Sequence, residues 1–134
     1  MRTIFVNLPV TDLERSKAFY TALGFTNNAQ FSDETAAAMV IEENIVAMLL
    51  TREKFAGFVP DGRVGDPAQG PSVLLALSAG SREECDDALG KALAAGGKPW
   101  QPAQDHGFMY GTSFADPDGN VWEVTWMDPA VVQG

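Results

Sequence analysis

The stretch Phe-Ala-Asp-Pro-Asp-Gly-Asn-Val-Trp-Glu-Val, residues 114–124, carries most of the information about the fold. Its Asp116-Pro-Asp-Gly119 portion is typical of a tight turn, because proline and glycine favour the backbone angles that turns require. The residues after it alternate as a strand does, with one apolar face (Trp122, Val124 and Trp126) and one mixed face (Val121, Glu123, Thr125 and Met127). An acid such as Glu123 in this setting needs a structural or a functional explanation.

This strand closes the second of two similar halves of the sequence. The first half begins with an alternating strand at residues 3–10, followed by a capping box, Thr11-Asp-Leu-Glu14, and a helix that a glycine ends. The second half repeats this order with a strand at residues 73–78, a capping box, Ser81-Arg-Glu-Glu84, and a second helix. Further strands are predicted after each helix, at residues 25–32, 36–41 and 45–51 and again at 98–104, 107–115 and 121–127.

The repeated order predicts an α+β protein made of two βαβββ modules. Module one spans residues 1–51, a linker rich in glycine and proline spans 52–71, and module two spans 72–128, all within one domain covering residues 1–134. Whether the modules pair within one chain or between two chains stays open at this point.

Composition and charge exclude several classes of function. Nine Lys and Arg residues against 18 Asp and Glu give a net charge of −9, which repels nucleic-acid backbones and anionic membranes. No apolar run approaches the roughly 18 residues that a membrane-spanning helix needs. The single Cys85 excludes an internal disulfide, and the single His106 excludes any mechanism that needs two histidines from one chain. We therefore expect a cytoplasmic protein that binds neither nucleic acid nor membrane.

The opening and closing segments of the chain resemble one known family. Val10-Thr-Asp-Leu-Glu-Arg-Ser-Lys-Ala-Phe-Tyr-Thr-Ala-Leu-Gly-Phe25 is similar to the first helix, and residues 114–124 to the last hairpin, of the vicinal oxygen chelate superfamily of glyoxalases, bleomycin-resistance proteins and extradiol dioxygenases. Three segments further resemble bacterial proteins described as predicted lactoylglutathione lyases: Phe5-Val-Asn-Leu-Pro-Val10, Ala47-Met-Leu-Leu-Thr51 and Gln104-Asp-His-Gly-Phe-Met-Tyr-Gly111. The resemblance implies a cup-shaped mixed sheet with the site inside it, and a homodimer.

The resemblance also implies a divalent metal, held by one residue from the first and one from the last strand of each module. Glu123 falls at the fourth of these positions. The other three fall on Phe5, on Met48 or a direct neighbour of it, and on Leu74. Phe, Met and Leu offer no oxygen or imidazole nitrogen, and a catalytic Zn²⁺ or Ni²⁺ ion needs about three ligands of that kind. We therefore predict that no metal of the family type and no other cofactor is bound.

Without a metal, the cup is expected to be an apolar pocket for a small molecule. The expected ligand-binding residues come from both modules: Phe5, Asn7, Met48, Leu74, Trp100, Phe108, Tyr110 and Thr125. Phe31 is a further candidate for the rim and Ser78 a further candidate polar anchor, and Glu123 and His106 are the candidate catalytic residues.

Four roles for Glu123 stay open. In a non-catalytic binder, as in the bleomycin-resistance members, it is a polar anchor for a ligand. In a lactoylglutathione lyase-like or isomerase-type enzyme it is the general base, with His106 as a partner. In a substitute metal site it binds Zn or Ni together with Asp105 and His106. In the simplest case it accepts hydrogen bonds from backbone groups or from Asn7 and has no other role.

Overall fold

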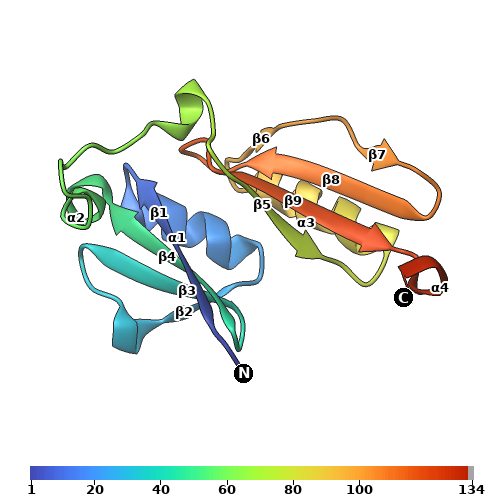
Figure 1. Ribbon diagram of the computed structural model, residues 1–134, viewed down its shortest axis with the longest axis horizontal. Helices are drawn as coiled ribbons and strands as arrows, with labels where there is room; N and C mark the ends of the chain where they lie inside the picture. The colour runs from blue at the N-terminus through green and yellow to red at the C-terminus, as the bar shows by residue number, and fades with distance from the viewer. Residues whose placement is uncertain (133–134) are drawn as a thin grey trace. The chain divides into compact units, whose positions relative to one another are not determined.

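Each half of the chain forms its own mixed sheet (Figure 1). The computed structural model describes residues 1–132, which divide into a first unit, Met1–Asp66, and a second unit that begins at Pro67. In both units the first strand lies parallel to the last one, and the remaining pairs are antiparallel. This confirms the predicted α+β class and its two βαβββ-type modules.

The first unit has the strand order β1-β4-β3-β2. Its elements are β1 (Ile4–Val10), α1 (Leu13–Ala22), β2 (Thr26–Asn28), a 3-10 turn η1 (Ala29–Phe31), β3 (Ala36–Glu42), β4 (Ile45–Thr51) and α2 (Arg52–Ala56). The second unit has the order β5-β9-β8-β6, and β7 also pairs with β8. Its elements are η2 (Pro67–Gln69), β5 (Leu74–Ser78), α3 (Arg82–Ala94), β6 (Lys98–Pro99), β7 (Gln104–Asp105), β8 (Met109–Ala115), β9 (Val121–Met127) and α4 (Pro129–Val132).

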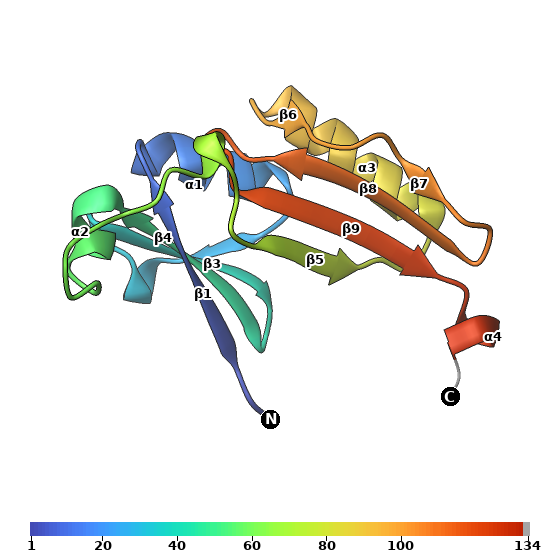
Figure 2. The ribbon, with the colours of Figure 1, turned by 45° about the horizontal axis from the view of Figure 1, so that its top comes forward.

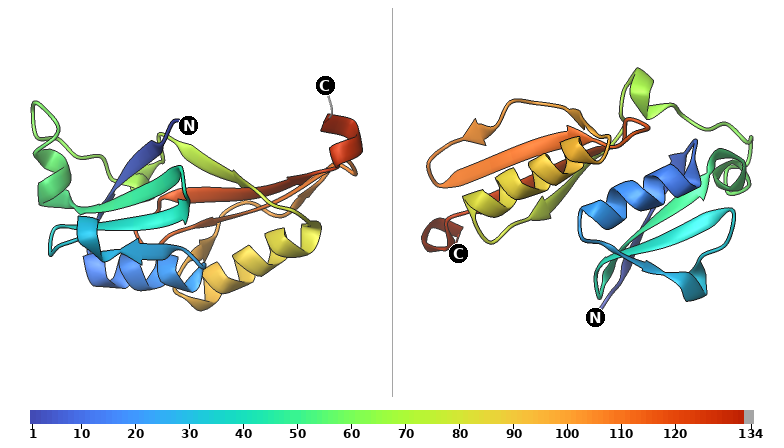
Figure 3. Two further views of the ribbon diagram at one scale, coloured as in Figure 1. Left: turned by 90° about the horizontal axis from the view of Figure 1, so that it is seen from below. Right: turned by 180° about the vertical axis from the view of Figure 1, so that it is seen from behind.

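One helix covers one face of each sheet, α1 in the first unit and α3 in the second (Figures 2 and 3). Strand residues on the helix face of the first unit are almost completely buried, among them Ala37, Met39, Ala47 and Leu49. In the second unit Phe114 and Trp122 are buried in the same way. Burying each large side chain contributes about 1.5–3 kcal/mol, so this packing against the helices stabilises each unit. The opposite face, which we call the open face, is left for other roles.

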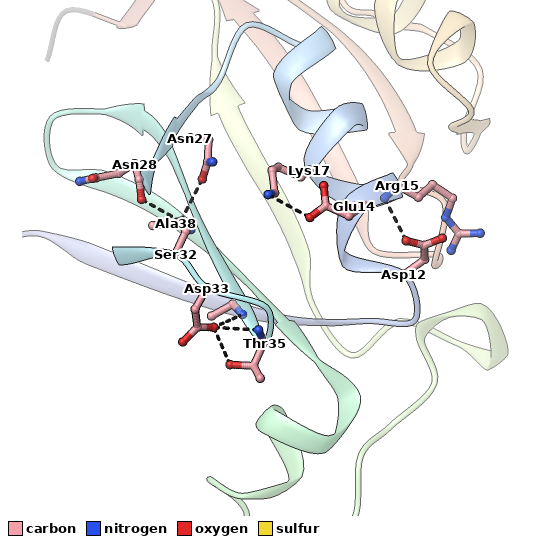
Figure 4. Close-up of polar contacts among 11 residues, drawn as sticks. Asp12, Glu14, Arg15, Lys17, Asn27, Asn28, Ser32, Asp33, Thr35 and Ala38 are labelled. Atoms are coloured by element: carbon pink, nitrogen blue, oxygen red, sulfur yellow. Dashed lines mark hydrogen bonds and ion pairs between the residues drawn. The ribbon is translucent and has the colours of Figure 1, made fainter. Parts of the chain in front are cut away.

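The N-cap residues of the two long helices agree with the predicted capping boxes, except that the cap of α1 lies one position later than predicted. Ser81 caps α3 as predicted, and its Oγ accepts a hydrogen bond from Glu84 N at 3.1 Å. Thr11 is not the cap of α1; Asp12 is, and its Oδ1 accepts from Arg15 N at 3.1 Å (Figure 4). Threonine and aspartate are both favourable N-cap residues. Here the Asp12 carboxylate caps the helix, and the Thr11 hydroxyl accepts a hydrogen bond from the Arg15 side chain instead.

Two predicted strands are shorter than expected. The strand predicted at 25–32 contains only β2, after which η1 begins. The strand predicted at 98–104 is split into β6 and β7, because Pro99 and Pro102 have no N–H to donate to a sheet. No helix within residues 1–132 combines the length and the apolar character needed to cross a membrane.

Candidate functional site

The open face of the first unit carries an apolar cavity of about 510 Å³. Its lining contains three predicted ligand-binding residues, Phe5, Asn7 and Met48. The pairing of β1 with β4 places Phe5 beside Val46 and Asn7 beside Met48, so these side chains share one face. The remaining wall comes from Thr3, Asn28, Phe31, Ala38, Val40 and Glu43. Among the sequence alternatives, Met48 is therefore the residue that faces this cavity, since Ala47 and Leu49 are buried on the helix face.

Phe31, which lines this cavity, is followed by a hydrogen-bonded turn whose contacts around Ser32, Asp33 and Thr35 are drawn in Figure 4. The Ser32 hydroxyl donates to the Asn28 carbonyl oxygen at 2.7 Å and accepts from Ala38 N–H at 3.0 Å, which ties η1 to β3. Asp33 Oδ1 then accepts from the N–H and the hydroxyl of Thr35, both at 2.7 Å. These bonds to Thr35 hold the pKa of Asp33 below its ordinary value.

The open face of the second unit carries a different cavity, of about 360 Å³. It brings together Glu123, His106 and Thr125, three of the residues predicted for the site. The other lining residues are mostly polar or small: Gln101, Pro102, Gln104, Met109, Gly111, Thr112 and Ser113. Within residues 1–132 the Glu123 carboxylate makes no hydrogen bond or ion pair. The simplest role considered for Glu123, an acceptor of backbone or Asn7 hydrogen bonds, therefore has no support in the structure.

His106 reaches this cavity on the connection between β7 and β8. The backbone N–H of His106 donates to the Met109 carbonyl oxygen at 2.8 Å, which closes the turn between the two strands. The preceding residue, Asp105, does not line the cavity, because Arg82 on α3 binds its carboxylate with two hydrogen bonds of 2.8 and 3.0 Å. The hydrogen bond from Arg82 and one from Gly107 N lower the pKa of Asp105 to about 2.

Four predicted ligand-binding residues lie outside the linings of these two cavities. Tyr110 is on the helix face of β8, where its hydroxyl donates to Asp86 Oδ1 at 2.6 Å. Trp100 lines a third cavity, formed with residues 67–71 and the 116–119 turn. Phe108 is exposed in the β7–β8 connection. Leu74 is 53% exposed on edge strand β5, where its pairing with Val121 gives it the same face as Glu123.

The donor set does not fit the metal that the resemblance implies. Within residues 1–132, no three His, Cys, Asp or Glu side chains are grouped so that they could hold an ion. Phe5 and Met48 face the first cavity with a phenyl ring and a thioether. The substitute site of Asp105, His106 and Glu123 is not formed, because Asp105 is bound to Arg82.

Sequence reasoning missed several polar residues of the second cavity. Ser113 lies directly opposite Glu123 in the pairing of β8 with β9, and its Oγ accepts from Gln101 N at 3.0 Å. The 116–119 turn fixes this pairing, so counting outward from that turn would have placed Ser113 beside Glu123. Gln101 and Gln104 carry no comparable signal, because Gln101 lies between β6 and β7 and Gln104 begins a strand of only two residues.

Comparisons with known proteins agree with this geometry. Residues 3–124 match the glyoxalase/bleomycin resistance protein/dioxygenase superfamily. A hypothetical protein from S. aureus is 27% identical and superposes with a TM-score of 0.78, with 94% of each chain covered. A lactoylglutathione lyase from Agrobacterium tumefaciens is 18% identical, with a TM-score of 0.68 over 92% of this chain and 91% of that one. An antibiotic-binding protein from a Streptomyces species is 20% identical, with a TM-score of 0.64 over 95% and 96%.

A search of curated proteins gave no match. The two structures below 25% identity share the fold, which is all that such a likeness shows. The match over residues 3–124 and the two βαβββ-type modules together establish that the chain belongs to the glyoxalase/bleomycin resistance protein/dioxygenase superfamily.

Proposed function

We propose that this protein binds a small, largely apolar molecule without using the metal of its family. The observation that carries the proposal is the cavity of the first unit, of about 510 Å³, which Phe5 and Met48 line at positions where the family resemblance implies metal ligands. Apolar walls with a few polar groups are typical of small-molecule sites. Here Asn7 and Thr3 supply such groups.

Two further observations support a binding role. A structural relative is described as an antibiotic-binding protein. The net charge of −9 favours a cationic ligand through the long-range field. We further propose that the two units form one glyoxalase-like domain, that the chain assembles as a homodimer and that it acts in the cytoplasm.

Replacing Phe5 by alanine tests this role directly. Two probes are suitable, the cationic aromatic antibiotic bleomycin and the neutral fluorescent dye N-phenyl-1-naphthylamine. We expect the wild type to bind at least one of them with a Kd of tens of micromolar or tighter. The F5A variant should bind about tenfold more weakly, since a phenyl wall is lost, which corresponds to about 1.4 kcal/mol. Because Phe5 is 60% exposed, the variant should fold normally.

The matched control for this measurement is Phe58→Ala. Phe58 is also exposed and lies in the same unit, but it is outside the cavity, with the Lys54 ammonium 5.7 Å from its ring centre. F58A should bind the probe like the wild type. Equal losses in F5A and F58A, or no binding of either probe by the wild type at 100 micromolar, would contradict the proposal.

One observation favours an enzyme as the second candidate function. Glu123, whose carboxylate has no partner within residues 1–132, lines the same cavity as His106. A carboxylate in that position is suited to act as a general base in a lyase- or isomerase-type reaction, as the resemblance to predicted lactoylglutathione lyases suggests. Against this, neither cavity contains Lys or Arg in its lining to stabilise a developing oxyanion.

Glu123→Gln separates the enzyme from the binder. The substrate to assay is the adduct of methylglyoxal and glutathione. If the protein is a lyase, E123Q should lower kcat by about 100-fold or more, because general base catalysis contributes 10²–10⁴-fold. If the protein is a binder, the wild type should show no turnover, and E123Q should keep the affinity for the neutral dye.

A further inference from the structure

We propose that Arg82, a residue outside both cavities, is a positioning residue that holds His106 in the second-unit cavity together with Glu123. The inference goes beyond the proposed binding function, which rests on the first-unit cavity, because it concerns the placement of His106 in the cavity of the second unit. It stands on the contacts of one guanidinium group with the chain on both sides of His106.

Arg82 binds the two residues that flank His106 in the sequence. Its Nη1 donates to Asp105 Oδ2 at 2.8 Å, and its Nη2 donates to Asp105 Oδ1 at 3.0 Å. The same Nη2 also donates to the Gly107 carbonyl oxygen at 2.9 Å. Asp105 Oδ1 in turn accepts from Gly107 N at 3.0 Å, so the acid and the glycine are joined to each other as well. The backbone of His106 is therefore fixed from both sides.

Two aromatic rings fix the guanidinium itself. The guanidinium carbon Cζ lies 5.1 Å from the ring centre of Tyr110 and 5.2 Å from that of Trp126. These two residues are paired with each other across β8 and β9. Contacts of this kind are favourable for arginine, whose flat group can stack on rings and bind a carboxylate at the same time. Tyr110 is anchored to α3 by its hydrogen bond to Asp86. This explains why Tyr110, predicted as a ligand-binding residue, lies on the helix face.

The segment that carries His106 has little packing of its own. All residues from 101 to 108 are exposed, so the hydrophobic core does not determine their conformation. Segments with few buried contacts open easily unless polar contacts hold them. The Arg82 contacts are polar and reach this segment from a well-formed helix of 13 residues. None of the atoms involved belongs to a residue of the cavity lining.

The experiment uses the fact that His106 is the only histidine in the chain. Its ring protons give a single, unambiguous set of proton NMR signals. In the wild-type background, Glu123→Gln should change the chemical shifts of these signals, because the two side chains line one cavity. In an Arg82→Gln background, the same Glu123→Gln change should alter the His106 signals at least threefold less.

The matched control is Lys91→Gln. Lys91 lies on the same helix and carries the same charge, but its partner is Asp87, at 2.8 Å and one turn away on α3. K91Q should keep the full response of His106 to Glu123→Gln. Arg82→Lys keeps the charge but not the two-pronged contact, so its response should resemble that of R82Q. A purely electrostatic role of Arg82 would instead leave R82K like the wild type, and that result would overturn the proposal.

Asp105→Asn gives a second route if R82Q fails to fold. This change leaves Arg82 stacked on its two rings but weakens its hydrogen bonds to residue 105. The change in the His106 signals caused by Glu123→Gln should therefore be smaller in this variant too. An unchanged response in a folded R82Q or D105N variant, or no response in the wild-type background, would refute the positioning role. Failure of the wild type to bind either probe, with the NMR response still dependent on Arg82, would count against the proposed function alone.

Discussion

Asp116→Ala is expected to lower the free energy of unfolding of the second unit by about 3 kcal/mol, because it removes a buried carboxylate that holds the last hairpin together. Asp116 is 1% exposed. Its Oδ1 accepts from Asp118 N at 2.9 Å and from Asn120 N at 2.8 Å, and its Oδ2 accepts from Asn120 Nδ2 at 2.9 Å. Alanine would remove the acceptor of these three hydrogen bonds, two of which come from Asn120, itself 8% exposed.

Urea denaturation followed by tryptophan fluorescence measures this effect. All three tryptophans, Trp100, Trp122 and Trp126, lie in the second unit, so the signal reports on that unit. Asp87→Ala is the control, since it also removes one acid from the second unit but breaks only an exposed ion pair on α3. Such a pair contributes about 0.3–0.5 kcal/mol. If D116A lost no more stability than D87A, the carboxylate would not support the hairpin as described.

Gly119→Ala is expected to destabilise the same hairpin by about 2–4 kcal/mol for two separate reasons. The backbone of Gly119 has φ +100°, which residues with a Cβ rarely adopt. A Cβ built there would lie 2.8 Å from the backbone nitrogen of Ala68 and 3.0 Å from its Cα. Since Ala68 contributes backbone rather than a flexible side chain, the η2 segment would have to move away from the turn.

Gly96→Ala separates the two costs. Gly96 has nearly the same backbone angle, φ +103°, but a Cβ there would meet no atom within 4 Å. We expect G96A to lose about 1–2 kcal/mol from the backbone angle alone. The extra loss in G119A then measures the close approach of Ala68, and thermal or urea unfolding of both variants gives the difference. Equal losses in the two variants would show that residues 67–69 are not held against the turn.

The sequence was sufficient for the fold because its local signals agree with one another. The cap at Ser81, the alternation around Glu123 and the turn at Asp116 each predict one element, and the structure contains all three. Strand lengths were harder to predict, since Pro99 and Pro102 interrupt a segment whose composition otherwise favours a strand.

The site residues also divide into those that local sequence patterns predict and those that depend on contacts between distant segments. Phe5, Asn7 and Met48 follow from alternation on strands whose ends were predicted well, and they line one cavity. Tyr110, predicted as a ligand-binding residue, lies outside both cavities on the helix face, because its orientation follows from the pairing of β8 with β9, which its own neighbourhood does not reveal. The contact between Arg82 and Asp105 joins residues 23 positions apart, and no local pattern announces it.

The division of each sheet into a helix face and an open face has a consequence for how this protein can evolve. Selection for folding acts mainly on the buried side, where Met39, Leu49 and Phe114 exclude solvent. The open sides differ between the two repeats, one presenting Phe5 and Met48 and the other Glu123 and Ser113. Substitutions there change what a pocket recognises while leaving the packing that maintains the native state. The two repeats thus carry two cavities lined by different side chains on similar backbones, and a substitution in one lining leaves the residues of the other unchanged.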